Sequence, residues 1–166
     1  MASLMACGRR GRWQTALELL DELDAASPGG APRQAFHAAL LACRKKLRHQ
    51  EALSLLDRMG PAADATAYDE VLLVLRKRDD YATARAVWSQ MGAAGVERGP
   101  QAYYHLLHVM GESGRWQQAL DLMDEMRAAG VAAHSGHYLA ALKACARDRR
   151  WAEAAGLLRS AAPALL

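Results

Sequence analysis

The stretch from Gln101 to Val131, QAYYHLLHVMGESGRWQQALDLMDEMRAAGV, predicts two short amphipathic helices joined by a tight turn. One helical face of its first half carries Tyr103, Leu106, Leu107 and Met110. The same spacing in its second half joins Trp116, Ala119, Leu120, Met123 and Met126. Gly114 and Gly130 end the two helices. Isolated helices shorter than about 12–15 residues are marginal in water, so this hairpin has to pack against copies of itself.

The composition favours an all-α globular chain. Of the 166 residues, 52% are hydrophobic but only 6% are aromatic, and Ala and Leu dominate the apolar set, which favours helix over sheet. No apolar run approaches the roughly 18 residues of a membrane-spanning helix, so we expect no membrane partner. In the N-terminal MASLMACGRRGRW the basic run follows the apolar one, which is not the order of a targeting peptide.

An internal repeat extends the hairpin over the whole chain. Its alanine recurs at intervals of 36, 32, 35 and 35 residues, at Ala16, Ala52, Ala84, Ala119 and Ala154. Three residues before it stand Trp13, His49, Tyr81, Trp116 and Trp151. Seven residues after it stand Leu23, Met59, Met91, Met126 and Ala161. Sixteen residues before it stand Phe36, Tyr68, Tyr103 and Tyr138. Such register predicts an α-solenoid of tandem helix-turn-helix hairpins.

We therefore expect one helical-repeat domain over residues 1–166. Its predicted repeats are 1–32, truncated at the start, then 33–64, 65–99, 100–134 and 135–166. The prolines at the junctions agree with this register, because proline ends or begins a helix without breaking it: Pro28, Pro32, Pro61 and Pro100.

No motif predicts catalysis, a cofactor or a metal. The three cysteines, Cys7, Cys43 and Cys145, occupy one equivalent place in different repeats, so we expect buried thiols rather than a disulfide or a zinc site. The run His105-x-x-His108-x-x-x-Glu112 lacks a fourth ligand nearby, and His134-x-x-His137 crosses a repeat junction. Phosphate-binding loops, nucleophile elbows and deaminase motifs are absent from the sequence. We expect a binding protein, not an enzyme.

The register resembles the pentatricopeptide repeat (PPR) family. The resemblance rests on the 35-residue period, the aromatic-to-alanine distance of sixteen, the Ala-Leu-x-Leu-x-x-x-Met run and the Gly-Val that follows it. The tetratricopeptide family differs in its Trp…Leu-Gly…Tyr pattern. The PPR resemblance implies a right-handed superhelix that acts on organelle RNA in a chloroplast or mitochondrion, in RNA processing, stability or translation, with one repeat facing one base of a single strand.

In that family, two residues per repeat choose the base. The resemblance places them at His37 with Asp64, Asp69 with Gly99, Tyr104 with His134, and Leu139, whose partner position falls past the last residue. None matches the family's usual Asn, Thr or Ser paired with Asp or Asn. Where the family has an aliphatic wedge, this chain has Gln34, Thr66, Gln101 and Gly136. These departures argue against sequence-specific reading.

Charge varies with the repeat. The turn segments that close each first helix hold fourteen basic residues and four acidic residues. These segments, which together form the basic stripe, are residues 8–12, 44–48, 76–80, 111–115 and 146–150. The fourteen residues that follow each segment have a net charge of −6 in total. Stacked hairpins would align these basic side chains along one edge, where a polyanion would meet positive charge at each repeat. Alternatively, the bases only complement helix dipoles, although three bases in a row exceed that need.

The resemblance assigns phosphate contact to one base near the end of each first helix. Arg9, Lys45, Lys77 and Arg147 occupy that place, and the fourth repeat has Glu112 there. The rings of His37, Tyr104 and His108 face away from the core, where they could stack on bases or contact a protein. We expect Trp13, Trp116 and Trp151 to pack toward the core and Trp88 to be partly exposed.

The predicted function is binding of single-stranded RNA, mainly through its phosphate backbone. The alternative is a protein-binding scaffold, such as a subunit of an organelle ribosome or enzyme complex, that uses the same surface. The basic stripe favours RNA, and the missing base-choosing pairs favour a protein partner.

Overall fold

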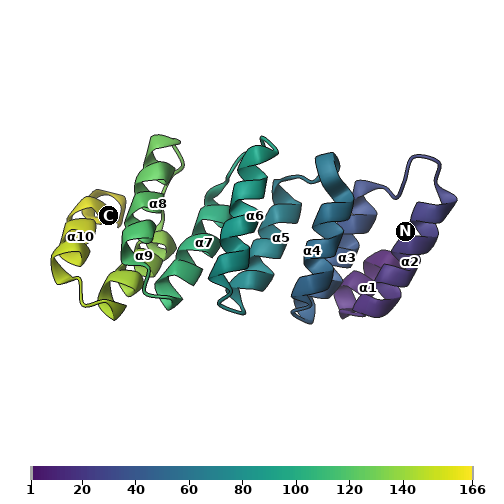
Figure 1. Ribbon diagram of the computed structural model, residues 1–166, viewed down its shortest axis with the longest axis horizontal. Helices are drawn as coiled ribbons and strands as arrows, with labels where there is room; N and C mark the ends of the chain where they lie inside the picture. The colour runs from purple at the N-terminus through teal and green to yellow at the C-terminus, as the bar shows by residue number, and fades with distance from the viewer. Residues whose placement is uncertain (1, 166) are drawn as a thin grey trace. The chain divides into compact units, whose positions relative to one another are not determined.

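Ten α-helices and one short 3-10 helix make up the computed structural model, which describes residues 2–165 and the side chains of residues 2–160. In chain order they are α1 (Ala2–Arg10), α2 (Trp13–Ala26), α3 (Arg33–Lys45), α4 (His49–Met59), η1 (Gly60–Ala62), α5 (Ala65–Arg76), α6 (Tyr81–Ala93), α7 (Pro100–Glu112), α8 (Trp116–Ala128), α9 (Ser135–Arg147) and α10 (Trp151–Leu165) (Figure 1). The predicted all-α helical-repeat fold is confirmed: a first and a second helix alternate along the described chain. The organisation of residues 1–166 as a single domain stays a prediction.

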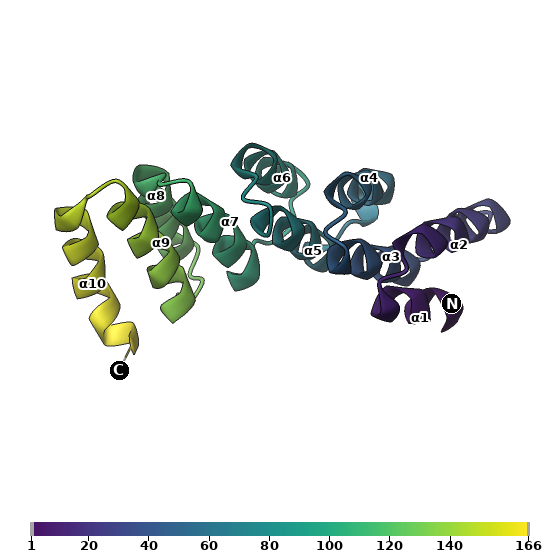
Figure 2. The same ribbon diagram turned by 90° about the horizontal axis from the view of Figure 1, so that it is seen from below.

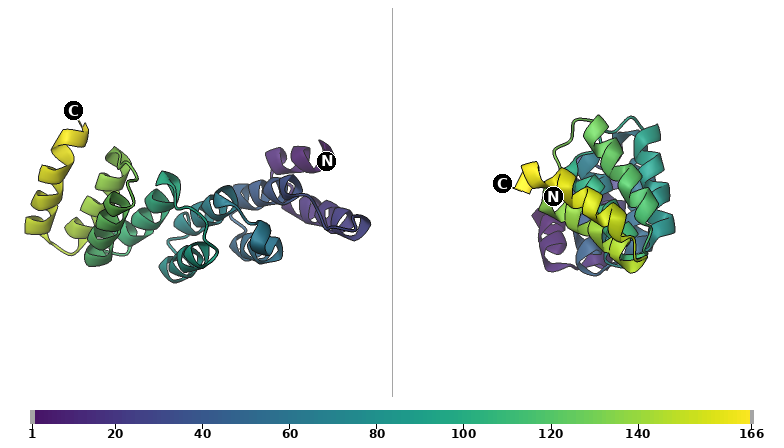
Figure 3. Two further views of the ribbon diagram at one scale, coloured as in Figure 1. Left: turned by 90° about the horizontal axis from the view of Figure 1, so that it is seen from above. Right: turned by 90° about the vertical axis from the view of Figure 1, so that its left-hand side faces the viewer.

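The chain divides into two compact units, residues 1–78 (unit 1) and residues 79–166 (unit 2). In unit 1, α1, α3 and α5 pack side by side, and α4 packs against both α3 and α5 (Figure 2). In unit 2, α7 and α9 pack side by side, α6 and α8 contact α7, and α10 contacts α9 (Figure 3). Within the described residues, no helix combines the length and the apolar character needed to cross a bilayer.

The register residues form the core. The aromatic residues of the first helices, Phe36, Tyr68, Tyr103 and Tyr138, are all buried. So are four of the five anchor alanines, Ala16, Ala52, Ala84 and Ala119. The three cysteines are free and buried, as predicted, and burial raises the pKa of Cys43 to about 11, with nearby Glu51 adding to the rise. Ala161 lies outside the residues whose side chains are described.

The prediction for the tryptophans was wrong in two places. Trp88 is 1% exposed and packs edge-on against the Tyr103 ring, with a centroid distance of 4.9 Å, so it belongs to the core. Trp151 is 67% exposed, and Trp13 and Trp116 are half-buried. The reason is position: these three residues begin second helices at the turn edge, where Trp13 still packs against a core cluster of Cys7, Ala16 and Ala42 but Trp151 is left largely in solvent.

Each turn between a first and a second helix contains one left-handed residue. This residue stands five before the anchor alanine, with φ between 53° and 68°, at Gly11, Leu47, Asp79, Gly114 and Arg149. In four of the turns, the amide after it donates back to a carbonyl of the first helix, for example Arg48 N–H to Cys43 O at 2.9 Å. A left-handed residue after the helix satisfies carbonyls that would otherwise lack a partner.

Two glycines allow neighbouring first helices to approach closely. A Cβ atom on Gly8 of α1 would lie 2.7 Å from the carbonyl oxygen of Ala38 in α3. A Cβ atom on Gly111 of α7 would lie 2.7 Å from the carbonyl oxygen of Ala140 in α9. Gly8 and Gly111 occupy equivalent repeat positions, eight residues before the anchor. Backbone therefore lies against backbone at both helix pairs, and only glycine fits.

One histidine connects three segments of unit 2. His137 is fully buried. Its Nε2–H donates to the carbonyl of Pro100 at 2.8 Å, and its Nδ1 accepts the backbone N–H of His134 at 3.1 Å. The Nδ1 contact requires the neutral ring, because a protonated Nδ1 cannot accept a hydrogen bond. Burial lowers the pKa of His137, and the hydrogen bond to Pro100 opposes this shift only in part.

We expect Gly111→Ala to lower the free energy of unfolding by about 1–3 kcal/mol, because α7 and α9 must move apart to admit the methyl group. Helix propensity alone predicts the opposite, a gain of up to about 1 kcal/mol. Gly29→Ala is the matched control, since nothing lies within 4 Å of the Cβ position there. Thermal and urea denaturation of both variants measure the difference. A Gly111→Ala chain as stable as its parent would contradict the close approach.

We expect acidification from pH 7 to pH 5 to destabilise the chain in part through His137. The unfolded chain takes up a proton near the ordinary pKa of about 6.5, whereas the folded chain takes it up only at lower pH. The unfolded state therefore binds more protons in this window, and stability falls as pH falls. In His137→Gln, urea denaturation from pH 5 to pH 8 should show a weaker pH dependence. An unchanged dependence would rule out His137 as a contributor.

Candidate nucleic-acid interface

The first base-facing pair is joined directly in unit 1. His37 lies on α3 and Asp64 is the N-cap of α5, and His37 Nε2 is 3.2 Å from Asp64 Oδ2. Asp64 also accepts the N–H of Ala67 at 3.0 Å and lies 3.6 Å from the Arg33 guanidinium. Burial alone would raise the pKa of Asp64, but the Ala67 N–H, His37 and Arg33 together lower it. The carboxylate therefore stays ionised and is held by groups of its own unit.

The third pair belongs to a cluster of rings in unit 2. The centroid of the Tyr104 ring lies 6.0 Å from that of His134 and 6.1 Å from that of His108. Gly136 lies against the same rings, and a Cβ atom there would be 3.1 Å from both Tyr104 Cε2 and His134 Cε1. A larger residue would separate these rings. The packing of these rings therefore explains why position 136 is a glycine, which the sequence alone did not explain.

The remaining base-facing candidates have unlike surroundings. Asp69 is half-buried on α5, and burial, aided by the charge of Glu70, raises its pKa to about 6. Gly99, its predicted partner, is the N-cap of α7. Asp69 belongs to unit 1 and Gly99 to unit 2. Leu139 is 68% exposed on α9. It presents an apolar side chain at the place where the fourth repeat has Tyr104.

Three of the four phosphate candidates lie in unit 1, at the C-terminal ends of adjacent helices. Arg9, Lys45 and Lys77 are all exposed, and each lies within one residue of the last residue of its helix, α1, α3 or α5. The Lys45 ammonium donates to the backbone carbonyl of Arg9, so the ends of α1 and α3 lie side by side. We call this group of basic side chains the basic edge of unit 1. Its members are close enough for one ligand to contact several of them.

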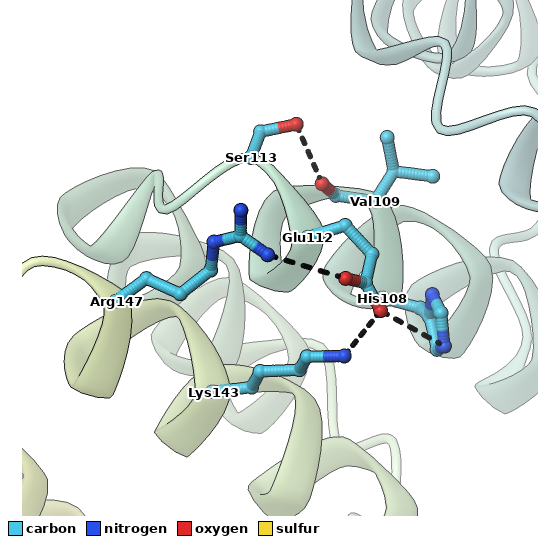
Figure 4. A network of polar contacts seen from close by, with 6 residues as sticks. All are labelled: His108, Val109, Glu112, Ser113, Lys143 and Arg147. Carbon is cyan, nitrogen blue, oxygen red and sulfur yellow. Dashed lines mark hydrogen bonds and ion pairs between the residues drawn. The ribbon is translucent and has the colours of Figure 1, made fainter.

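The fourth phosphate candidate is engaged by a carboxylate. In unit 2, Arg147 Nη1 lies 3.5 Å from Glu112 Oε2, and Lys143 forms an ion pair with the other oxygen of Glu112 (Figure 4). His108 Nε2 lies 4.0 Å from that same oxygen. The hydrogen bond from Lys143 is the main reason why the pKa of Glu112 is lowered. Glu112 thus neutralises part of the basic edge in unit 2.

Three further arginines of the basic stripe stack on aromatic rings. The guanidinium carbon lies 4.1 Å from the Trp13 ring for Arg48, 4.0 Å from the Tyr81 ring for Arg115 and 4.2 Å from the Trp116 ring for Arg150. Each arginine directly precedes a second helix, and each ring begins the second helix of the preceding repeat. Arg-Trp pairs that recur at the repeat period are the sequence signal for this contact. These stacks stabilise the array of helical repeats, and they leave fewer basic side chains for a ligand.

The two units therefore differ in the charge of their turn segments. The turn residues of unit 1, at 8–12, 44–48 and 76–78, hold ten bases and no acid. Those of unit 2, at 79–80, 111–115 and 146–150, hold four bases and four acids. Attraction for a polyanion is thus concentrated in unit 1, whereas unit 2 offers a nearly neutral edge beside its ring cluster.

The histidines considered as metal ligands separate in the structure. His105 is 5% exposed and lies in the core, whereas His108 and Glu112 come within 4.8 Å of a carboxylate oxygen of Asp79. Any cation there would compete with Lys143 and Arg147 for Glu112. His137 already uses both ring nitrogens in the fold.

Known proteins resemble this chain at two levels. The family profile described as PPR repeat matches residues 4–26 and 102–131. No curated protein sequence matches the chain significantly. Among solved structures, pentatricopeptide repeat protein PPR10 from maize is 30% identical and superposes with a TM-score of 0.81 over 96% of this chain. A structure of PPR10 in complex with an 18-nt psaJ RNA element is also 30% identical, with a TM-score of 0.80 over 98% of the chain.

A third similar structure is the PPR domain of Arabidopsis thaliana protein-only RNase P 1 in complex with tRNA. It is 17% identical, with a TM-score of 0.78, and the match covers 96% of this chain and 85% of that domain. At this identity the match supports the fold alone. The chain spans only 23% and 24% of the length of the two PPR10 chains. The repeat register, the profile matches and the likeness to PPR10 lead to one conclusion: the chain contains repeats of the pentatricopeptide type and has the fold of a PPR solenoid.

Proposed function

We propose that this protein binds single-stranded RNA, mainly by contacts between the basic edge of unit 1 and the phosphate backbone. The observation that carries the proposal is the placement of Arg9, Lys45 and Lys77 at the ends of three adjacent helices. Directly packed helices are about 8–10 Å apart, so side chains at successive ends can reach along one strand. The PPR repeats of this chain and the RNA complex of PPR10 support RNA as the polyanion.

Base-specific reading has a small part in this proposal. The His37–Asp64 contact satisfies polar groups that would otherwise face a base, and Leu139 offers no hydrogen bond. The rings around Tyr104 are suited to stacking, which tolerates any base. We therefore propose modest base preference and an affinity that depends strongly on salt.

The wider role that we propose is RNA processing, stability or translation in a chloroplast or mitochondrion. This part rests on the family alone. We assign no catalytic step to the chain.

A protein-binding scaffold is the second candidate function. A groove of unit 1 between α2 and α4 favours it, because the groove combines apolar Leu17 and Leu55 with charged Asp21, Glu51 and Arg58. Such a mixed lining suits a peptide better than a polyanion. The two functions predict different responses to salt and to charge reversal.

We expect filter binding of U-rich and A-rich oligonucleotides to give similar affinities that fall steeply with salt. Each neutralised phosphate of a single strand contributes about −0.7 to the slope of log affinity against log salt concentration. Three contacts from unit 1 therefore predict a slope near −2, because only the backbone is held. No retention of either oligonucleotide at low salt would exclude RNA binding and leave the scaffold.

We expect the triple variant Arg9→Glu, Lys45→Glu, Lys77→Glu to lose most of the RNA affinity and most of the salt dependence, because like charges would then face the phosphates. The matched control reverses three exposed arginines of second helices, Arg85, Arg127 and Arg159, which changes the net charge equally. The control should retain binding. Equal loss in both variants would show that overall charge, rather than this edge, attracts RNA.

A further inference from the structure

Three nitrogen groups of unit 2 converge on a single carboxylate. Lys143 Nζ bonds Oε1 of Glu112, Arg147 Nη1 lies 3.5 Å from Oε2, and His108 Nε2 lies 4.0 Å from Oε1 (Figure 4). His108 and Glu112 come from α7, whereas Lys143 and Arg147 come from α9. The Glu112 side chain is 22% exposed, while those of Lys143 and Arg147 are 48% and 54% exposed.

The close packing of α7 and α9 holds this group together. Gly111 directly precedes Glu112, and there the backbones of α7 and α9 lie so close that a Cβ atom would be 2.7 Å from the Ala140 carbonyl oxygen. Lys143 and Arg147 stand one turn apart on α9 and so face the same side. The two cationic groups are therefore positioned by the fold.

Glu112 is an exception in the repeat pattern. It stands seven residues before the anchor alanine, and the other four repeats have Arg9, Lys45, Lys77 and Arg147 at that position. Lys143 and Arg147, which in another context would attract a phosphate, instead hold a carboxylate of their own unit. Carboxylate and phosphate oxygens accept hydrogen bonds from the same lysine and arginine groups.

We propose that Lys143, Arg147 and His108 form a phosphate-binding site that the Glu112 carboxylate fills, so that Glu112 competes with an RNA phosphate. This inference rests on the proposed RNA binding and adds a limit to it: unit 2 contributes little backbone affinity while Glu112 is present. The fold thereby confines phosphate contact to unit 1.

A divalent cation is the competing ligand for this cluster. Ligand atoms of Asp79, His108 and Glu112 lie within 4.8 Å of one another. Two fixed cations already contact Glu112, however, and they would repel a metal ion at the same oxygens. When the Glu112 charge is removed, Lys143 and Arg147 face only the carboxylate of Asp79, so the remaining charge of the cluster favours an anion.

The test compares Glu112→Gln with the parent chain in filter binding of a U-rich oligonucleotide. Glutamine preserves the size of the side chain but removes the charge. We expect roughly tenfold tighter binding at low salt, the usual effect of one charge-assisted contact, and a slope steeper by about 0.7. Asp124→Asn is the matched control: it removes one carboxylate of an exposed ion pair on α8, with Arg127, and should not change the affinity.

Adding Arg147→Gln to Glu112→Gln should abolish the gain. If Glu112→Gln changes neither the RNA affinity nor its salt slope while the parent chain binds RNA, the proposal that Glu112 fills a phosphate site is wrong. The proposed RNA-binding function then still stands. Circular dichroism confirms that each variant is folded.

A second measurement separates failure of the site from failure of RNA binding. Inorganic phosphate is titrated while the side-chain NMR signal of Arg147 is observed. A shift in Glu112→Gln that is absent in the parent supports the site even if no RNA is bound. Saturable Mn²⁺ binding by the parent that Glu112→Gln abolishes would overturn the proposal in favour of a cation site.

Discussion

Burial of the apolar faces of short helices against neighbouring hairpins is the constraint on which this protein depends. The α-helices are 9 to 15 residues long, a length at which an isolated helix is marginal in water. In unit 1, α1 and α3 each pack against their own second helix and against the next first helix, and in unit 2 α7 packs in the same way against α8 and α9. Gly8 and Gly111 have no side chain where the backbones of two first helices meet, so these two helix contacts depend on glycine.

This lateral packing also divides the basic residues by role. Arg48, Arg115 and Arg150 lie over rings of the preceding repeat, where a guanidinium and an aromatic face attract each other. Arg9, Lys45 and Lys77 instead remain exposed at helix ends. Some of the positive charge therefore stabilises the array, some pairs with carboxylates such as Glu70 and Glu112, and the exposed helix ends of unit 1 are left for a ligand. Basic residues that are neighbours in the sequence belong to both groups.

The two units show how one repeat can serve different purposes. In unit 1 the turn segments hold basic residues and no acidic ones, although Arg44 and Arg48 pair with carboxylates of the neighbouring helices. In unit 2 the same positions are balanced by acids, and the nearby surface carries the rings of Tyr104, His108 and His134. Neither backbone contact nor ring stacking selects a base sequence, so both units would tolerate any RNA sequence. The His37–Asp64 contact in unit 1 is consistent with that tolerance, because it occupies both groups with each other.

The sequence by itself determined the helical repeats, the buried register residues and the basic turn segments, because a 35-residue period records which positions every repeat must bury. Only the tertiary structure decided which basic side chains are exposed. It paired His37 with Asp64, engaged Arg147 with Glu112 and buried Trp88, which the period had suggested was partly exposed. The physical reason is that periodicity describes one hairpin, whereas the partner of a side chain comes from the next hairpin. Which residue it meets depends on how closely two helices approach, and that distance is set by packing.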